Sequence, residues 1–246
     1  MPYRYETHCH SAEGSKCSKI PIVELVGFYH RMGYSGVCLT DHFTGNSPLI
    51  PDKMPWNERV EFYYDIYLKG CEIAGKYGIA VFFGLEYSIA PDIDFPSTRI
   101  GNDFVFLNLS KEWYLENKSV FRCKPREMLA TIRKAGGFII QAHPFGEFLA
   151  HHWYDGIRLY PRDVDATEIK GNGAVLNLNK VYAQTYNLFD VTGTDTHSDD
   201  VKIMFGMETD EPCLTPAEFV EAIKSGRARP FQFDRTDLVD AKFPMK

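Results

Sequence analysis

The chain has 246 residues, of which 44% are hydrophobic and 24% charged, the composition of a globular protein with a sizeable core. Its formal net charge of −6 argues against the broad basic face that nucleic-acid binding needs, so no stable nucleic-acid partner is expected. A nucleotide substrate is compatible with this charge, because bound metal ions can supply local positive charge.

The six cysteines form no Cys-x-x-Cys pair, so they indicate neither a disulfide framework nor a structural zinc site. We expect reduced thiols and, without a signal peptide at the amino terminus, a cytoplasmic protein. The longest apolar runs, such as residues 79–85, are too short to span a bilayer, and no membrane partner is expected.

Segments with the apolar character of strands are followed, along most of the chain, by segments with helical periodicity. In the first helix, Ile22, Leu25 and Tyr29 mark an apolar stripe, and Ser18 is the expected cap. The expected strands are residues 3–8, 36–40, 79–86, 103–109, 138–142, 165–169 and 191–193. The expected helices are residues 20–32, 57–77, 125–134, 178–186 and 216–225, the last capped by Thr215.

Strands that alternate with helices pair in parallel, in either an open doubly wound sheet or a barrel. No Gly-x-Gly-x-x-Gly segment follows an expected strand, so the dinucleotide-binding fold has no support. No internal repeat and no Gly/Ser linker divides the chain, and a single domain over residues 1–246 is expected.

Histidines and carboxylates are concentrated just past the apolar strand segments. In a parallel α/β architecture these strand ends converge on one face, which in barrels is the face where active sites are found. Each residue alone has an ordinary structural explanation, such as a helix cap or a packed core histidine, but coincidence accounts poorly for all of them together. The residues are His8, His10, Asp41, His42, Glu86, His143, Asp195 and His197.

These residue types indicate a metal site. Imidazole and carboxylate groups together bind borderline divalent ions such as Mn²⁺, Fe²⁺ and Zn²⁺. Side chains two residues apart on an extended segment point to the same side, so His8 and His10 can hold one ion together. The sequence therefore predicts a metal centre at the carboxyl ends of the strands.

Five short motifs, taken in order, resemble the PHP (polymerase and histidinol phosphatase) superfamily over about residues 3–231. The resemblance implies an α/β fold, a distorted (β/α)7 TIM-like barrel with the metal site at the carboxyl ends of its strands. It also implies a metal-dependent phosphoesterase with two or three divalent ions, Mn, Fe or Zn. The motifs are His-x-His at 8–10, Thr-Asp-His at 40–42, Gly-x-Glu at 84–86, His-Pro at 143–144 and Gly-x-Asp-x-His at 193–197.

The resemblance also implies how the ligands are shared among the ions. One ion is expected among His8, His10, Glu86 and Asp195. Glu86 would bridge to a second ion, which also takes His143. A third ion would be held by His42 and His197.

Two positions depart from the commonest pattern of the family. Many members carry a ligand Asp in a Ser-Asp-Gly segment after the first motif, where Glu13 is the nearest carboxylate of this chain. Many also open the strand after the Gly-x-Glu motif with a histidine, where this chain has Asp103. Glu13 and Asp103 are the expected replacements, although Asp103 is equally well explained as an ordinary residue at a strand start.

The family chemistry would be hydrolysis by a water that the metal ions activate for in-line attack on phosphorus. The metal charge would neutralise the negative charge that develops on the phosphoryl oxygens. The expected catalytic residues are Asp195, a ligand needed for metal and activity alike, and His197 or Asp41, donating a proton to the leaving oxygen. Asp41 is alternatively a residue that orients a neighbouring ligand.

A compact single domain favours a small phosphate monoester or nucleotide as substrate over a polymer. Arg158 and Arg162, on loops at the expected mouth of the site, are the candidates to hold the phosphate. One alternative is an amidohydrolase-type enzyme that cleaves C–N or C–O bonds, although such enzymes usually bridge their metals with a strand-end lysine where this chain has Glu86. The other alternative is a non-catalytic metal-binding module of the same family.

Overall fold

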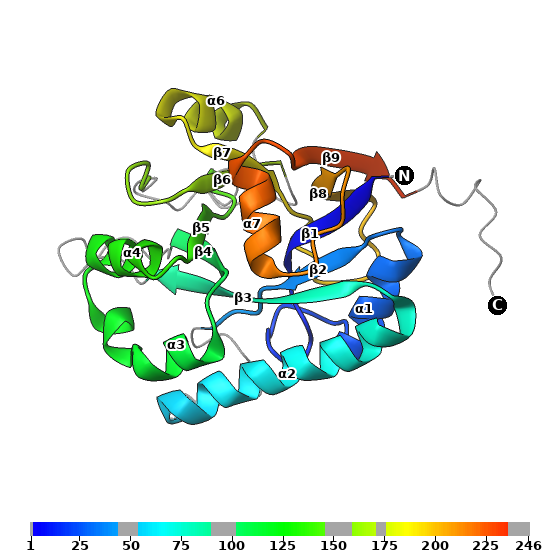
Figure 1. Cartoon of the computed structure of the whole chain (residues 1–246), viewed down its shortest axis with the longest axis horizontal. Helices are drawn as coiled ribbons and strands as arrows, with labels where there is room; N and C mark the ends of the chain where they lie inside the picture. The colour runs from blue at the N-terminus through cyan, green and yellow to red at the C-terminus, as the bar shows by residue number, and fades with distance from the viewer. Residues whose placement is uncertain (1, 44–53, 90–101, 146–158, 171–175, 236–246) are drawn as a thin grey trace.

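The computed structural model describes residues 2–43, 54–89, 102–145, 159–170 and 176–235, whose strands form one nine-stranded sheet that curls into a nearly closed barrel (Figure 1). The order along the sheet is β7-β6-β5-β4-β3-β2-β1-β8-β9, and the two end strands, β7 and β9, lie in contact. The architecture is the distorted TIM-like barrel expected from the sequence. No helix in these ranges is long and apolar enough to cross a membrane.

Every expected strand and helix is present, with bounds that differ by a few residues at most. The strands are β1 (Tyr3–Cys9), β2 (Gly36–Leu39), β3 (Ala80–Ile89), β4 (Asn102–Leu107), β5 (Phe138–Gln141), β6 (Ala166–Lys170), β7 (Phe189–Thr192), β8 (Ile203–Thr209) and β9 (Arg229–Asp234). The helices are α1 (Ile22–Arg31), α2 (Trp56–Tyr77), α3 (Lys111–Glu116), the 3-10 helix η1 (Lys118–Arg122), α4 (Pro125–Lys134), α6 (Leu176–Tyr186) and α7 (Pro216–Lys224).

Three strands depart from the expected parallel pairing. Strands β1 to β3 are parallel to one another, and so are β5 to β7, but β4, β8 and β9 are antiparallel to their neighbours. Strand β4 runs antiparallel to β3, and Asn102 at its start pairs with Ile89 at the end of β3. The start of β4 therefore lies at the carboxyl ends of the parallel strands.

Strands β8 and β9 were not predicted from the sequence. Strand β8 has Gly206 at its centre, and a glycine weakens the pattern by which a strand is recognised. Strand β9 is exposed over much of its length and carries Pro230, as edge strands do. These two antiparallel strands fill the space between β1 and β7.

Helix α1 buries the predicted apolar stripe, with Ile22 and Tyr29 at most 1% exposed. Ser18 is not its N-cap, because the helix begins at Ile22; the Ser18 hydroxyl donates to the carbonyl oxygen of His10 at 2.8 Å and accepts a hydrogen bond from the Ile20 N–H at 3.3 Å. The first turn is capped by Glu13, whose Oε2 accepts a hydrogen bond from the Ile22 N–H at 2.8 Å. The prediction of Ser18 as the cap was wrong because the helix begins two residues later than expected, with Pro21 at the N-cap position.

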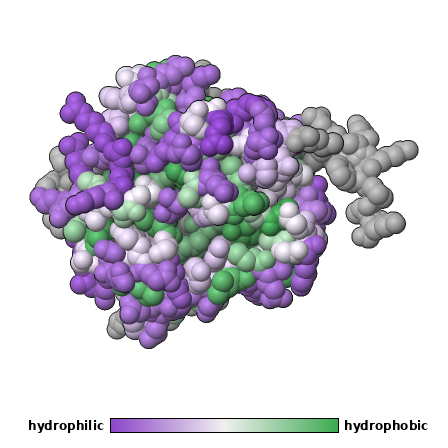
Figure 2. All heavy atoms as spheres, viewed as in Figure 1, coloured by the Kyte–Doolittle hydropathy of each residue, from purple (hydrophilic) through white to green (hydrophobic). Residues whose placement is uncertain are grey.

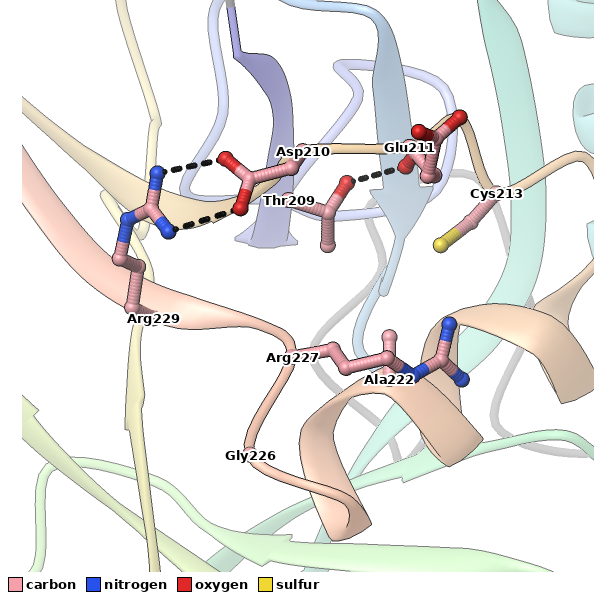
Figure 3. A pocket seen from close by; sticks show the side chains of 8 residues that line it. All are labelled: Thr209, Asp210, Glu211, Cys213, Ala222, Gly226, Arg227 and Arg229. Carbon is pink, nitrogen blue, oxygen red and sulfur yellow. Dashed lines mark hydrogen bonds and ion pairs between the residues drawn. The ribbon is translucent and has the colours of Figure 1, made fainter.

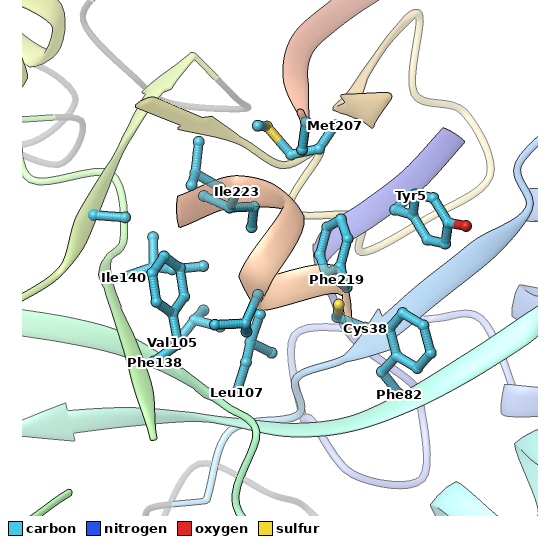
Figure 4. Packing of buried hydrophobic residues seen from close by; sticks show 14 of the residues in the cluster. Tyr5, Cys38, Phe82, Val105, Leu107, Phe138, Ile140, Met207, Phe219 and Ile223 are labelled. Atoms are coloured by element: carbon cyan, nitrogen blue, oxygen red, sulfur yellow. The ribbon is translucent and has the colours of Figure 1, made fainter. Parts of the chain in front are cut away.

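Helix α7 packs against the inner face of the sheet, inside one end of the barrel (Figures 1 and 4). Its Phe219 is fully buried, with its ring centroid 4.9 Å from that of Tyr5 in β1 and 5.9 Å from that of Phe82 in β3. The helix begins in a capping box formed by Thr215 and Glu218, as the predicted Thr215 cap requires. In the space-filling view of this face, hydrophobic residues lie toward the middle and hydrophilic residues around them (Figure 2).

The inner face of the barrel carries the core at one end and polar groups at the other. Residues an even number of positions apart in a strand share a face, so Phe82, which contacts α7, and Glu86 both point inward from β3. Helix α7 closes the end of the barrel near Phe82. The carboxyl end of β3, with Glu86, is therefore directed away from this plug.

Candidate metal centre

The carboxyl ends of the parallel strands bring histidines and carboxylates from distant parts of the chain into one cluster. Three overlapping groups of residues lie within it, and in each group the possible ligand atoms lie within 4.8 Å of one another. The groups are His8, Glu86 and His143; His8, His10 and Asp195; and His10, His42 and His197.

Glu86 lies at the centre of this cluster, and its side chain is fully buried. Oε1 lies 3.2 Å from Nε2 of His8 and 3.4 Å from Nε2 of His143. Oε2 lies 2.8 Å from Nδ1 of His42 and 3.4 Å from Nε2 of His10. Neither oxygen accepts a hydrogen bond of good geometry from the described residues, and burying a carboxylate in that way is costly. Divalent cations between the carboxylate and the rings would compensate this cost.

The charge state of Glu86 also suits a cation. Burial alone would raise the pKa of its carboxyl group, but the charges of His42 and His8 outweigh burial and hold the pKa well below its ordinary value. Backbone pairing beyond the end of β2 fixes these groups side by side: the Glu86 N–H donates to the Asp41 carbonyl at 3.1 Å, and the Phe43 N–H donates to the Glu86 carbonyl at 2.8 Å.

His8 is oriented by Glu168, a residue of β6 that the sequence analysis did not identify. Nδ1 of His8 lies 2.8 Å from Oε1 of Glu168, so Nε2 is directed to Glu86 and to Oδ1 of Asp195, which lies 3.5 Å away. Glu168 is 2% exposed, and its Oε2 accepts a hydrogen bond from the backbone N–H of His143 at 2.9 Å. Glu168 lies within the expected strand 165–169 and not at its end, so the strand-end pattern that identified Glu86 did not identify it.

His10 is held in a neutral state suited to binding metal. Burial, followed by the charge of His42, lowers its pKa to about 3. Its Nδ1 lies 3.1 Å from the Ser15 hydroxyl, which in turn donates to Oδ1 of Asp41 at 2.7 Å. Asp41 also accepts two hydrogen bonds from Ser11, and burial raises its pKa to about 6 despite these contacts. Asp41 thus contacts His10 through Ser15.

Residues 193–197 are held against the end of β1. The N–H of Asp195 donates to the carbonyl of His8 at 2.8 Å, and the N–H of His10 donates to the carbonyl of Thr196 at 3.1 Å. Gly193 is required at this close approach, because a Cβ there would lie 2.7 Å from the Cβ of His8. Close packing against His8 therefore explains the glycine of the Gly-x-Asp-x-His motif.

Asp195 and His197 face the cluster from this segment. Oδ1 of Asp195 lies 3.0 Å from Nε2 of His10. Burial would raise the pKa of Asp195, but the charge of His8 and the hydrogen bond with His10 hold it well below its ordinary value. Nδ1 of His197 donates to the Asp195 carbonyl at 2.8 Å, which leaves Nε2 as the ring nitrogen that can bind an ion.

Glu6 supports the same region from within β1 and was also missed from the sequence. Its Oε1 accepts hydrogen bonds from the N–H groups of His8 at 2.9 Å and Thr194 at 2.8 Å, and its Oε2 accepts one from the Tyr29 hydroxyl at 3.0 Å. Burial raises its pKa to about 7 despite these bonds. Glu6 thus ties the first and last motifs to α1.

The two expected replacement ligands have different positions. Asp103 lies at the start of β4, which the reversal of this strand brings to the cluster edge; it interacts with His143 and accepts a hydrogen bond from the Ser88 hydroxyl. Glu13 does not join the described cluster. Its carboxylate caps α1, and its other oxygen lies 3.7 Å from Nζ of Lys69. The carboxylate expected to replace the family Asp is therefore engaged at the helix.

Of the two arginines expected to hold phosphate, the described one, Arg162, is not brought to the cluster. Arg162 precedes β6, and its carbonyl accepts a hydrogen bond at 3.2 Å from Arg133 near the end of α4. Since β6 carries Glu168 toward the site at its other end, Arg162 lies on the side where the strand begins. Arg158 lies outside the described residues, and its role stays a prediction.

Cys17 is a further residue next to the cluster that the sequence analysis did not single out. It is exposed, and the imidazole rings of His197 and His42 interact with its thiol. Burial of the thiol would raise its pKa, but these two histidines outweigh that effect and lower the pKa to about 7.

Two hollows in the described part of the chain are separate from this cluster. One follows the outer side of α1 and includes Lys19 and Arg31. The other lies at the end of the barrel where β1 begins (Figure 3), and there Arg229 is held by Asp210 through contacts of 2.8 and 3.3 Å. No residue of the cluster lines either hollow.

No family model matches this sequence, and no curated protein matches it. Solved structures do share its fold. A two-domain protein from Bacteroides vulgatus, named as containing a predicted PHP-like metal-dependent phosphoesterase, aligns with a TM-score of 0.66 at 17% identity over 94% of this chain. This chain spans 65% of the length of that protein.

Two further structures align over nearly their whole length. A protein from Bifidobacterium adolescentis, named as a putative metal-dependent phosphoesterase, has a TM-score of 0.54 at 13% identity, covering 90% of this chain and 95% of that one. An amidohydrolase from Chromobacterium violaceum, solved with sulfate and no metal, has a TM-score of 0.54 at 16% identity, covering 92% and 97%. The fold of this chain is therefore the one found in PHP-like metal-dependent phosphoesterases, as the motifs in its sequence predicted.

Proposed function

We propose that this chain is a metal-dependent hydrolase that cleaves a small phosphate ester, a monoester or a nucleotide, at a centre of two or three divalent ions. The observation that carries the proposal is Glu86, whose two buried oxygens lack hydrogen bonds of good geometry among the ring nitrogens of four histidines. The choice of phosphate esters is supported by the fold shared with proteins named as metal-dependent phosphoesterases.

We assign the ligands to three sets, of which the first two share Glu86. The first ion takes His8, His10, Glu86 and Asp195; the second takes Glu86 and His143, with Asp103 beside it; the third takes His42 and His197. Mn²⁺, Fe²⁺ and Zn²⁺ are the candidate ions for imidazole and carboxylate ligands.

Divalent ions at these positions would supply a Lewis acid and positive charge to a phosphoryl group. The chain itself orients the ligands: Glu168 fixes the ring of His8, and Asp41 acts through Ser15 on the ring of His10. Asp41 is therefore assigned to positioning rather than to proton donation, because Ser11 and Ser15 occupy its carboxylate.

His197 has the most exposed side chain of the cluster, 29%, and is placed to meet the substrate. Its Nε2 can bind an ion or donate a proton to the leaving oxygen, but not both at once, because a coordinated nitrogen carries no proton. If His197 donates the proton, kcat should fall as the pH rises and this group loses its proton. Loss of that fall in His197→Gln would support proton donation.

The test is metal content and phosphate release, measured on the same preparations. His8→Ala and Asp195→Ala should each lose bound metal and at least about a hundredfold of activity on phosphate monoesters, because each removes a ligand. His30→Ala is the matched control, since this histidine lies on α1 and stacks on Tyr77 away from the cluster. Full metal and full rate in the His8 or Asp195 variant would overturn the assignment.

The amidohydrolase alternative is favoured by one observation, the similarity in fold to the Chromobacterium violaceum amidohydrolase. Rates on lactones and cyclic amides, compared with rates on phosphate esters in the same metal, separate the two activities. A fully metal-loaded chain that turns over neither class would instead be the non-catalytic metal-binding module.

A further inference from the structure

Asp195, a proposed ligand of the first ion, has a backbone conformation that is uncommon for a residue with a side chain. Its φ is 53°, in the left-handed region, and such a conformation persists only where the surrounding structure holds it. Two backbone hydrogen bonds join this segment to β1, from the N–H of Asp195 to His8 and from the N–H of His10 to Thr196. The residues on either side of Asp195 are held by buried side chains as well.

The residue before Asp195 is held by Glu6, whose side chain is fully buried. Oε1 of Glu6 accepts a hydrogen bond from the N–H of Thr194 at 2.8 Å and another from the N–H of His8 at 2.9 Å. One carboxylate oxygen therefore fixes the backbone at Thr194 relative to the backbone of His8, which is a second proposed ligand of the first ion.

The residue after Asp195 is held by Tyr29 of α1. The Tyr29 hydroxyl donates to Oε2 of Glu6 at 3.0 Å and lies 2.6 Å from Oγ1 of Thr196. A phenol carries one proton, so the Thr196 hydroxyl is the donor in the second of these hydrogen bonds. All three side chains are fully buried. Their hydrogen bonds form a chain from Thr194 through Glu6 and Tyr29 to Thr196, and Asp195 lies between its two ends.

We propose that Tyr29 is a positioning residue of the metal centre, which holds Asp195 in the geometry of the first ion by linking Thr196 to Glu6. The inference rests on the proposed function, because it takes Asp195 as a metal ligand. It adds a residue of α1 that belongs to none of the three groups of possible ligands. Residues that orient a ligand without touching the metal contribute about 10- to 100-fold in affinity. The backbone hydrogen bonds with β1 remain when Tyr29 loses its hydroxyl, so we expect an effect at the lower end of that range.

The test is the Kd for Co²⁺, measured by competition with a chelator, together with the visible absorption of the bound ion, which reports its coordination geometry. Tyr29→Phe keeps the ring and removes the hydroxyl, whereas Thr196→Val keeps the shape of the side chain and removes the other end of the link. Each variant should raise the Kd of one bound ion about tenfold and alter the absorption spectrum of the bound cobalt. The double variant should bind about as weakly as either single variant, because each change breaks the same link and the effects do not add.

Tyr5→Phe is the matched control. This buried tyrosine of β1 packs against Phe219 of α7, and its hydroxyl also makes two hydrogen bonds, both with the backbone of Cys213. The change should lower the free energy of urea unfolding of the metal-free protein, as Tyr29→Phe does, but it should leave the Kd and the cobalt spectrum of the wild type. A loss of affinity that merely follows a loss of stability would appear in both tyrosine variants.

The outcomes separate this inference from the proposed function. The positioning role is overturned, and the metal centre stays in place, if Tyr29→Phe keeps the wild-type Kd and spectrum, if the losses in the double variant multiply, or if Tyr5→Phe loses as much affinity. Should Tyr29→Phe fail to fold, the Kd of Thr196→Val decides alone, raised in support of the link or unchanged against it. A wild-type protein that takes up no cobalt overturns the metal centre and the positioning role together.

Discussion

Glu168 contacts two residues of the cluster and is itself buried, with 2% of its surface exposed. Its Oε1 lies 2.8 Å from Nδ1 of His8, and its Oε2 holds the N–H of His143 at 2.9 Å. The backbone of His143 has a φ of 26°, which a residue with a side chain rarely adopts, and the hydrogen bond from its N–H offsets part of that strain. A carboxylate behind a ligating imidazole fixes its tautomer and raises its basicity.

Glu168→Gln should therefore lower the affinity for metal by about 10- to 100-fold without removing a ligand. The amide can accept only one of the two hydrogen bonds and carries no charge to support His8. The measurement is the Kd for Zn²⁺ by competition with a chelator, and the tautomer of His8 by NMR of its ring nitrogens. Glu13→Gln, at a glutamate whose carboxylate caps α1, is the control and should bind metal as the wild type does. An unchanged Kd in Glu168→Gln would refute this positioning role.

The residues that could be predicted from sequence are those that follow an apolar strand. Glu86 ends the apolar segment 79–86 and His143 follows the segment 138–142, and the pattern alone places them at the same end of the sheet. Glu6 and Glu168 lie inside strands, where a single carboxylate among apolar residues does not indicate a site. Cys17 lies in a loop without periodicity. Their importance depends on contacts with residues more than a hundred positions away or across a loop, which no local pattern contains.

At the scale of elements, α7 has an unusual position for a helix of an α/β barrel. It packs inside the barrel, with Phe219 and Ile223 against inward side chains of several strands (Figure 4). Each fully buried side chain of this size contributes about 1.5–3 kcal/mol. The helix therefore stabilises the strands from the end opposite the metal cluster, without contacting the ligands.

Phe219→Ala should destabilise the protein by about 3–5 kcal/mol, because it leaves a cavity between Tyr5 and Phe82. Urea unfolding of the metal-free protein measures this difference. Leu214→Ala, on a side chain that is 74% exposed just before the same helix, should change stability by no more than about 0.5 kcal/mol. Equal effects of the two changes would mean that α7 is not part of the core.

The predicted elements failed where pairing, rather than periodicity, decides the structure. Helix α4 and its first-turn Pro125 were predicted with the observed bounds, because proline and the apolar spacing are local signals. The antiparallel direction of β4 and the presence of β8 and β9 are set by which strand lies beside which, and a single sequence does not encode that in any short window.

At the scale of the whole molecule, the candidate metal centre brings together side chains from segments that lie far apart in the sequence. Residues between positions 8 and 197 supply its groups, from the ends of β1, β2, β3, β5 and β7. With no cation, the buried carboxylate of Glu86 has only nearby imidazoles to balance it, so the metal-free fold bears a local cost at the point where these strands converge. Binding of ions should therefore be coupled to the stability of the entire barrel.

Adding Zn²⁺ or Mn²⁺ to the metal-free protein should raise its Tm, because an ion that binds only the folded state stabilises it by mass action. At a free concentration a hundredfold above Kd the gain is about 2.7 kcal/mol for one ion, which corresponds to on the order of 5–10 °C in a chain of this size. Calorimetry with and without metal, followed by a chelator to reverse the shift, measures it. The His8→Ala, Asp195→Ala double variant should show a much smaller shift, since it lacks two ligands of the first ion. If the double variant gained as much as the wild type, the stabilising ions would be bound elsewhere, and the strand-end cluster would not be the metal centre.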